Sequence, residues 1–583
     1  MTNARARLSV LTRHLTTSAL SPEPVHIHQL NPTFFLPKAA EIEPNALAEV
    51  HKSRTNTDVR FTYRQFSARV VALAHYFKHH GYKRIAILGP NTPAHLETMF
   101  AATAAGGIVL GLNYRLSKTE ITYKMDLGKA DCVVVDSEFE NLITPDSKRH
   151  VIVDLDDFSD ATGANCQYAQ AIKEGFEIAK QQLGFYPGEK HRNAHEDWVA
   201  LHAENVEEDS LLGLFFTSGT TGKPKGVEYT HRGVYLAALS NVIEAGLNRQ
   251  AAFGGHGRCK YLWTLPLFHA AGWTYPYSVT AVRGTHYLLR KVDVDRIWDL
   301  LIHEGITHFN AAPTVNTMLL NSEKAQKLPQ EVHVIVAAAP PSSQLFHDMV
   351  AHNLYPVHMY GLTETYGPFT RSYFKEEWKD LPHHDMVDKL AHQGHAFLTS
   401  AKARVVRPDF TDVASDGKEM GEIIVRGNIV AKGYHNNPTA TKESFDGWFK
   451  TGDLAVMHPN GAIQIQDRKK DIIISGGENI SSVFVEGELS RHEAILECAV
   501  VGKPDKHYGE VPVAFVVLRR GYKEGTNFNT NDLVEWLKQQ IGRYQVPRTV
   551  KVLDALPKTS TGKLRKNVLR DQLKEEAKSE GSG

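Results

Sequence analysis

The sequence predicts an α/β protein, and three observations along its 583 residues support this class. Up to about residue 340, short apolar runs alternate with helical segments, which is typical of parallel βαβ units. From about residue 402, short alternating strands follow one another between glycine-bearing turns, which indicates a small β-rich subdomain. A last unit of about 110 residues, after the charged stretch 468–471, mixes helices with strands.

The strands of the first region are expected to be buried apolar runs, most of them followed by a turn or a helical segment. Residues 137–207 are more polar, and we interpret them as a decorated connection. In the last unit we expect helices at 482–491 and 531–541, strands at 497–501 and 511–518, and a loop tail. The expected strands of the first region lie at 84–91, 106–110, 132–136, 261–266, 307–311 and 332–338.

Composition excludes several classes of protein. Lys plus Arg and Asp plus Glu both number 66, so the formal net charge is zero, which argues against nucleic acid as the main partner. No apolar run reaches about 18 residues, so we expect no membrane span. Cys132, Cys166, Cys259 and Cys498 are far apart, which argues against a disulfide scaffold or a cysteine zinc site and favours a reducing compartment.

Residues 1–22 have the composition of a mitochondrial transit peptide. They contain Arg5, Arg7 and Arg13, several hydroxyl residues and no acid. We therefore predict a mitochondrial matrix protein whose mature chain begins near Glu23. A disordered basic tail is the alternative reading, with a cytoplasmic or peroxisomal location, although the last residues do not resemble the peroxisomal Ser-Lys-Leu signal.

The stretch 217–226 combines glycines, hydroxyl residues and lysines directly after an apolar strand at 211–216. Glycines let backbone N–H groups approach an anion, while hydroxyls add donors and lysines add positive charge. The spacing is not that of a Walker loop, so we predict a triphosphate-binding loop outside the P-loop NTPases. The candidate ligands are Thr217, Ser218, Gly219, Thr220, Thr221, Gly222, Lys223 and Lys225.

Five motifs together resemble the adenylate-forming superfamily, which includes acyl-CoA synthetases, peptide-synthetase adenylation domains and firefly-type luciferases. The resemblance implies that a carboxylate attacks the α-phosphorus of ATP, giving acyl-adenylate and pyrophosphate, and that the thiol of coenzyme A then displaces AMP. It also implies stacked, mostly parallel sheets in an N-terminal domain at 23–469, with its β-rich subdomain at about 400–469, and a mobile C-terminal α+β domain at 470–583. The motifs are 217–226, 360–365, 447–453, 467–480 and 557–563, within a resemblance that covers roughly residues 40–570.

The resemblance implies catalytic roles for a few residues. Lys563 would bridge the substrate carboxylate and the α-phosphate as the catalytic cation. Glu364 would hold Mg²⁺ together with Thr220, because hard oxygen ligands suit that ion. Thr363 would hydrogen-bond the α-phosphate.

Nucleotide, hinge and thiol contacts follow from the same resemblance. Asp453 would accept hydrogen bonds from both ribose hydroxyls, Arg468 would also reach the ribose, and Tyr360 would stack near adenine. Lys470 falls at the hinge between the two domains. The remaining assignments are Gly361, Ala338, Ala339 and Pro340 for ATP or AMP, and Gly476, Gly477 and Glu478 for the coenzyme A tunnel.

The segment 265–273 resembles the gate to the acyl pocket in this superfamily, with His269 at the gate position. Trp273, Val315 and Ala337 would border the acyl group, which favours a short or medium-chain acid or a small aromatic acid. The Phe-His-x-x-Gly-Trp pattern is most similar to the plant and fungal acyl-activating branch, which includes medium-chain, butyrate and benzoate ligases.

The main hypothesis is therefore a carboxylic acid–CoA ligase that uses ATP, Mg²⁺ and coenzyme A and exists as a monomer or homodimer. Three alternatives stay open. The chain could be an adenylation enzyme that loads a carrier protein, although no acidic residue stands at the start of the stretch 308–312 to meet an amino group. It could also be a luciferase-like oxygenase or a non-catalytic nucleotide-binding scaffold.

Overall fold

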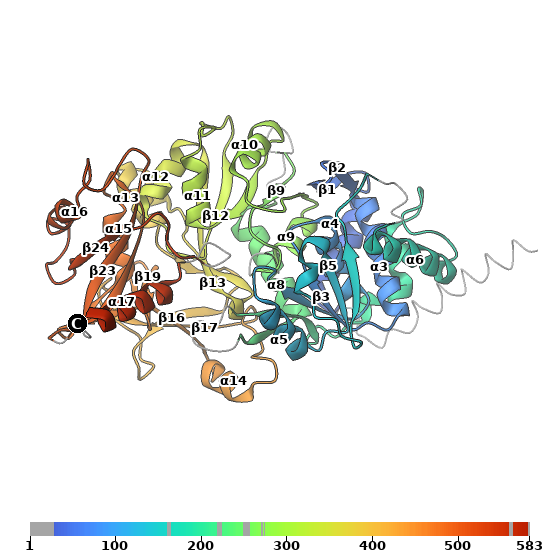
Figure 1. The fold of residues 1–583 in the computed structure, drawn as a ribbon. Helices are drawn as coiled ribbons and strands as arrows, with labels where there is room; N and C mark the ends of the chain where they lie inside the picture. Colours follow the sequence, from blue (N-terminus) through green and yellow to red (C-terminus); the bar gives the residue numbers. More distant parts are fainter. Residues whose placement is uncertain are drawn as a thin grey trace, which may run out of the picture.

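A six-stranded sheet forms one end of the computed structural model (Figure 1), which describes residues 28–159, 165–217, 224–248, 257–269, 272, 274–505, 507–558 and 564–580. Its strand order is β6-β5-β3-β4-β7-β8, and all neighbours are parallel except β7 and β8. The strands are β3 (Arg84–Leu88), β4 (Ile108–Leu112), β5 (Cys132–Asp136), β6 (His150–Asp154), β7 (Leu211–Phe216) and β8 (Gly226–Thr230). The helices of this region are α3 (Tyr63–His79), α4 (Pro93–Ala104), α5 (Lys118–Gly128) and α6 (Gln167–Leu183).

A nine-stranded sheet follows, in the order β15-β14-β13-β12-β11-β9-β10-β1-β2. It is parallel from β13 to β1 and antiparallel at both edges. The strands are β1 (Leu47–Lys52), β2 (Asp58–Thr62), β9 (Lys260–Trp263), β10 (Thr285–Leu288), β11 (His308–Ala311), β12 (Val332–Val336), β13 (Leu354–Leu362), β14 (Gly367–Arg371) and β15 (His395–Ala396). The helices around it are α2 (Phe35–Ile42), α8 (His231–Glu244), α9 (Tyr275–Ala281), α10 (Val294–His303), α11 (Pro313–Leu320), α12 (Ser343–Ala351) and α13 (His383–Leu390).

The two faces of the nine-stranded sheet carry separate cores, because side chains alternate along each strand. Phe309 and Val334 point outward and pack with α10, α11 and α12. Ile335 and Met359 point inward and pack with Tyr275 of α9 and with residues of the six-stranded sheet. The inner face therefore lies between the two large sheets.

Two smaller sheets complete the chain. In Figure 1 the C-terminal domain, in orange and red, lies at the opposite end from the six-stranded sheet, in blue and cyan. The antiparallel sheet β16-β17-β18-β19 comprises Lys402–Val406, Met420–Arg426, Phe449–Met457 and Ile463–Arg468, with α14 (Pro438–Phe445) beside it. The last sheet comprises β20 (Ile473–Ser475), β21 (Glu478–Ile480), β22 (Ile495–Asp505), β23 (Gly509–Leu518) and β24 (Thr549–Val552), with α15 (Ser482–Leu489), α16 (Thr530–Leu537) and α17 (Lys566–Glu580).

The predicted α/β class and the positions of the expected strands are confirmed, and two expectations are wrong. The polar region 137–207 is more than a connection, since it supplies edge strand β6 and helix α6, which packs on α3. The expected loop tail contains β24 and helix α17. Leu569 and Leu573, four residues apart, are each 1% exposed and pack against β22 and β23, so the sparse apolar stripe of this charged helix is buried.

Three observations concern the compositional expectations. Cys132, Cys166, Cys259 and Cys498 are all buried, and none forms a disulfide. Within the part of the chain that the structure describes, no helix has the length and hydropathy needed to cross a membrane. The predicted transit peptide at 1–22 lies outside the described residues.

Candidate active site

Three predicted nucleotide-binding residues meet where the nine-stranded sheet borders the β16–β19 sheet. Asp453 on β18 faces Arg468 on β19, and the Arg468 Nε lies 3.1 Å from an Asp453 carboxylate oxygen. The Tyr360 hydroxyl, from β13, donates to the other oxygen at 2.8 Å. Asp453 is 3% exposed. A carboxylate fixed in this way presents its remaining lone pairs in a defined direction, as the recognition of paired hydroxyl groups requires.

Glu364 lies in the short 3-10 helix that follows β13 and is held by a residue that the sequence did not single out. The Tyr434 hydroxyl donates to Glu364 Oε1 at 2.8 Å, and the Ala431 amide donates to the Glu364 carbonyl oxygen at 2.8 Å. Burial raises the pKa of Glu364, while the Tyr434 hydrogen bond and the charge of Lys225 act in the opposite direction. Lys225 Nζ lies 4.4 Å from the centre of the Tyr434 ring. Tyr434 lies outside the five motifs, so the sequence alone did not indicate its contact with Glu364.

The predicted triphosphate loop joins the antiparallel strands β7 and β8. Its two described ends are tied together, because the Thr217 amide donates to the Lys225 carbonyl at 3.0 Å and the Lys225 amide donates to Thr217 Oγ1 at 3.3 Å. The Tyr229 hydroxyl, on β8, donates to the Thr363 carbonyl at 2.5 Å and so links this hairpin to the end of β13. Six of the predicted ligands lie outside the described residues, namely Ser218, Gly219, Thr220, Thr221, Gly222 and Lys223.

The backbone is unusual at two predicted nucleotide contacts. Ala338 follows β12 with a φ of +79°, a left-handed conformation that costs a non-glycine residue about 1–2 kcal/mol. Ala339 and Pro340 continue this turn. At Gly361 a Cβ atom would stand 1.9 Å from the Gly367 carbonyl oxygen of β14, so only glycine fits this hairpin. Strained turns of this kind often line functional sites.

The gate segment is anchored by Asn91, which sequence reasoning missed. The Asn91 side-chain amide donates to the carbonyls of Trp263 and Leu265 at 3.1 and 3.0 Å, and its oxygen accepts from the Leu267 amide at 2.7 Å. Asn91 ends the turn after β3. A polar residue at the carboxyl end of a parallel strand was the sequence feature from which a role for Asn91 could have been predicted. These bonds fix the start of the segment that carries His269.

His269 is half-buried just after this anchored segment. Its amide donates to the Pro266 carbonyl at 3.1 Å, and the preceding Phe268 packs edge-on against Tyr114, with ring centres 5.3 Å apart. Tyr114 follows β4, so the gate touches the six-stranded sheet. Trp273 lies outside the described residues.

The other two predicted acyl-pocket residues lie on different faces of the nine-stranded sheet. Ala337 follows Val336, whose side chain points outward, so Ala337 shares the inner face with Ile335. Val315 lies on α11 in the outer core. The structure therefore does not bring Val315 beside Ala337 on one face.

The hinge and tunnel residues surround the first hairpin of the C-terminal domain. Lys470 is exposed between β19 and β20. Gly476 and Gly477, with φ of +61° and +88°, form the turn between β20 and β21, and the exposed Glu478 begins β21. Positive φ at both positions explains the glycine pair.

A buried network crosses from β19 into the C-terminal domain. Asp467 accepts hydrogen bonds from the Ser482 amide and hydroxyl at 2.7 and 2.6 Å. Lys566 Nζ reaches Ser482 Oγ at 2.5 Å and Glu486 at 2.7 Å. Lys566 begins α17 three residues after Lys563, which itself lies outside the described residues. The base of the predicted catalytic-lysine segment is thus anchored to the strand that carries Arg468.

The same segment approaches the hairpin of the triphosphate loop. The pKa of Glu120, on α5, is lowered mainly by its hydrogen bond from the Ser117 amide, and the positive charge of Arg565 adds to this effect. The Tyr123 hydroxyl of α5 donates to the Pro224 carbonyl at 3.5 Å. Arg565, two residues after Lys563, therefore acts on α5, the helix whose Tyr123 contacts the segment between the end of β7 and the start of β8.

No group of three or more His, Cys, Asp or Glu side chains able to hold a metal occurs among the described residues. Glu364 offers one partly buried carboxylate. Mg²⁺ is usually held by one or two carboxylates plus substrate phosphates and water, so this single ligand fits that ion when ATP supplies the rest.

Comparison with known proteins identifies the family. A model of the AMP-binding enzyme family matches residues 36–435, and a model of the AMP-binding enzyme C-terminal domain matches residues 485–563. An acetate–CoA ligase of Humulus lupulus is 39% identical, covering 94% of this chain and 95% of the relative. A peroxisomal acetate/butyrate–CoA ligase of Arabidopsis thaliana is 37% identical, covering 95% and 96%. The o-succinylbenzoate CoA synthetase of Bacillus subtilis, solved with its acyl-adenylate, is 25% identical with a TM-score of 0.72, covering 94% and 99%.

The chain belongs to the AMP-binding enzyme family, whose fold it shares. Within that family it is an acyl-CoA synthetase, which activates a carboxylic acid with ATP and then forms the thioester with coenzyme A. The predicted resemblance to the plant and fungal acyl-activating branch is confirmed. The mitochondrial location finds no support in these relatives, since one of them is named peroxisomal.

Proposed function

We propose that this synthetase acts on a short carboxylic acid and that Mg²⁺ accompanies ATP in the first half-reaction. The supporting observation is that two clusters meet beside β13. In one, Tyr360 and Arg468 hold Asp453 as an acceptor for ribose hydroxyls. In the other, Tyr434 holds Glu364 as a carboxylate for a hard cation. The names of the acetate and acetate/butyrate relatives support a short acid.

Mg²⁺ would be held by Glu364 and Thr220 and would neutralise charge on the ATP phosphates. The chain prepares this role through Tyr434, whose hydroxyl stabilises the ionised form of Glu364 despite its burial. Lys225, beside the same ring, adds positive charge where the phosphates would lie. Thr363 would hydrogen-bond the α-phosphate.

The second half-reaction would use the other face of the C-terminal domain. Lys563 would first stabilise the charge that develops as the acid attacks ATP, and rotation at Lys470 would then withdraw it. The Gly476–Gly477 turn and Glu478 would replace it and line the path of coenzyme A. The anchored position of Lys566 and the nearness of Arg565 to α5 support an orientation in which the first step occurs.

Pyrophosphate release measured against a panel of acids tests this function. We expect strong release with acetate to butyrate that depends on coenzyme A for turnover. Lys563→Ala should lose the first half-reaction but still convert preformed acyl-adenylate, and full first-half activity would refute its role. Adenylation that coenzyme A does not stimulate would favour a carrier-protein or oxygenase function, and no activity on any acid would favour a scaffold.

The location in the cell and the oligomeric state are separate proposals. The composition of residues 1–22 supports import into mitochondria, whereas the peroxisomal relative supports the alternative. Fusing residues 1–22 to a fluorescent protein distinguishes them, because a diffuse signal would refute the import function. Light scattering distinguishes the monomer from the homodimer.

A further inference from the structure

The inner face of the nine-stranded sheet continues directly from Ala337 into the protein. β12 ends at Val336, which pairs with His358, so Ala337 is the first residue beyond this strand and Met359 is the next residue of β13. One row deeper on the same face, β11 pairs Asn310 with the inward-pointing Ile335. An acyl group that enters past Ala337 therefore meets the Asn310 row next, two residues or about 7 Å along the strands.

Tyrosine side chains close this row from the opposite side. Tyr275 begins α9, is 0% exposed, and points its hydroxyl at the Met359 sulfur at 3.7 Å. The Asn310 amide lies beside that hydroxyl. Tyr261, on β9, is 1% exposed, and its ring centre is 5.6 Å from that of Tyr275. Aromatic rings thus lie across this row on the side away from the sheet, and an acyl group longer than about four or five carbons would have to displace them.

This closed end is polar although it is buried. Among the described residues, the Tyr261 hydroxyl and the Asn310 side-chain oxygen have no hydrogen-bond partner. The Tyr275 hydroxyl has the Asn310 side chain and a methionine sulfur, which is a weak acceptor, as its partners. Buried donors and acceptors without partners are costly, and phenylalanine or leucine would fill the same space without that cost. The arrangement is explained if a bound molecule supplies the missing partners.

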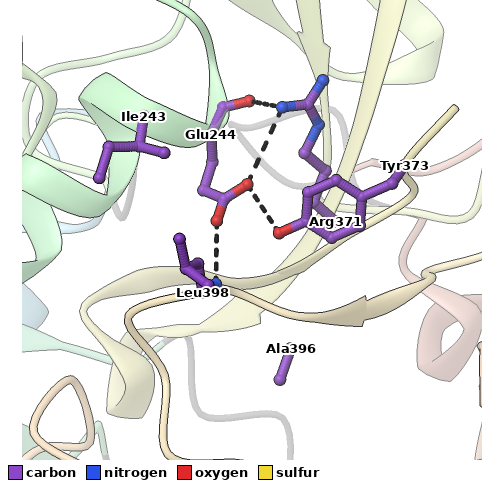
Figure 2. Close-up of a pocket in the computed structure, with 6 residues that line it drawn as sticks. All are labelled: Ile243, Glu244, Arg371, Tyr373, Ala396 and Leu398. Atoms are coloured by element: carbon purple, nitrogen blue, oxygen red, sulfur yellow. Dashed lines mark hydrogen bonds and ion pairs between the residues drawn. The ribbon is translucent and has the colours of Figure 1, made fainter.

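The pocket between the end of α8 and strands β14 and β15 bears on the charge of that molecule. It measures about 380 Å³ and contains Glu244 and Arg371, both within electrostatic range of Tyr275. Figure 2 shows how these groups satisfy one another: Glu244 accepts from Tyr373 at 2.7 Å and from the Leu398 amide at 3.0 Å, and the Arg371 guanidinium binds the Glu244 backbone and lies 3.8 Å from its carboxylate. Arg371 is already matched by an acid, so a second carboxylate on the substrate would meet no uncompensated positive charge.

We infer that the preferred acid is short and carries a neutral hydrogen-bonding oxygen, a hydroxyl or a carbonyl, at its third or fourth carbon. Tyr261, Asn310 and Tyr275 recognise that oxygen and so determine specificity. The inference rests on the proposed function, because it takes Ala337 as the border of the acyl group. A site built to hydrogen-bond such an oxygen discriminates strongly against the plain alkyl acid, since binding the latter leaves the polar groups unpaired.

The test compares kcat/KM for 4-hydroxybutyrate, acetoacetate, butyrate and hexanoate at saturating ATP and coenzyme A. The wild-type enzyme should favour at least one oxygenated acid over butyrate by about tenfold or more, and hexanoate should be the poorest. Tyr261→Phe and Asn310→Leu, measured separately, should each reduce that ratio about tenfold.

Tyr277→Phe is the matched control. Tyr277 lies on the same helix as Tyr275, Thr103 lies beside its hydroxyl, and its ring packs on Phe100 with centres 4.8 Å apart. It should leave the ratio unchanged.

Several results would overturn the inference. The inference is wrong if kcat/KM for butyrate equals that for both oxygenated acids, or if kcat/KM for hexanoate equals that for butyrate. It is also wrong if neither Tyr261→Phe nor Asn310→Leu changes the ratio, because ordered water would then be the partner of the polar groups. These outcomes leave the ligase function intact, whereas a wild-type enzyme silent on every acid would refute the ligase itself. Because each variant is judged by a ratio of two acids, a partial loss of folded enzyme cancels.

Discussion

Replacing Tyr434 with phenylalanine isolates one hydrogen bond to the carboxylate proposed to hold the metal. The ring should keep its place, because it packs against Phe445 and under Lys225. The 2.8 Å bond to Glu364 is lost. A hydrogen bond to a charged group contributes about 1.5–3 kcal/mol, and one pKa unit corresponds to about 1.4 kcal/mol. Tyr434→Phe should therefore raise the pKa of Glu364 further, by about one to two units.

The direction of the effect of Tyr434→Phe on the rate follows from the negative charge that Glu364 must carry to hold the metal. Glu364 must be ionised to hold Mg²⁺, so a higher pKa moves the acid limb of the pH–rate profile to higher pH. Pyrophosphate release measured over a pH series should show Tyr434→Phe about ten- to a hundredfold slower on the acid side, recovering as the pH rises. Glu364→Gln, which cannot ionise, should show no such limb. A uniform loss at every pH, or a limb that moves downward, would refute the reasoning.

Three further predictions concern the ribose site, the domain junction and the core. Asp453→Asn should raise the KM for ATP about tenfold by leaving the Arg468 charge unmatched, and an unchanged KM in steady-state kinetics would exclude the ribose role. Ser482→Ala removes the hydroxyl that bridges Asp467 and Lys566. It should slow adenylation about fivefold more than thioester formation from preformed acyl-adenylate; equal losses would contradict the anchoring role. Glu49 is fully buried with both oxygens unpartnered among the described residues, and its pKa is raised by burial. The stability of the wild-type protein should therefore fall as the pH rises above the pKa of this carboxyl in the unfolded chain. Thermal unfolding of Glu49→Gln should not show this fall. The same pH dependence of stability in both proteins would refute the prediction.

The sequence was sufficient for features that depend on local pattern. The runs at 84–88 and 132–136 are strands because continuous apolar residues suit a sheet covered on both faces. Asp453, Arg468 and Tyr360 lie in three separate motifs, and the resemblance to one family placed them in a single site. Spacing alone could not have shown that they touch.

Other features depend on contacts between distant parts of the chain. Tyr434 is 70 residues from Glu364, and Asn91 is 172 residues from Trp263, so neither partner is visible in a local window. Helix α17 was missed because its charged composition hides an apolar stripe that is meaningful only once β22 and β23 are beside it. Tertiary packing decides such elements more than intrinsic propensity does.

The burial of all four cysteines bears on the chemistry that this protein carries out. An acyl-adenylate is an electrophile, and the second half-reaction requires that a thiol from outside the protein captures it. Burial raises the pKa of Cys132, Cys166, Cys259 and Cys498, so the enzyme's own sulfur atoms remain protonated and out of contact with solvent. Because the thiolate is the reactive form, these four cysteines are protected from acylation by the acyl-adenylate. The intermediate can then wait for coenzyme A without modifying the protein that made it.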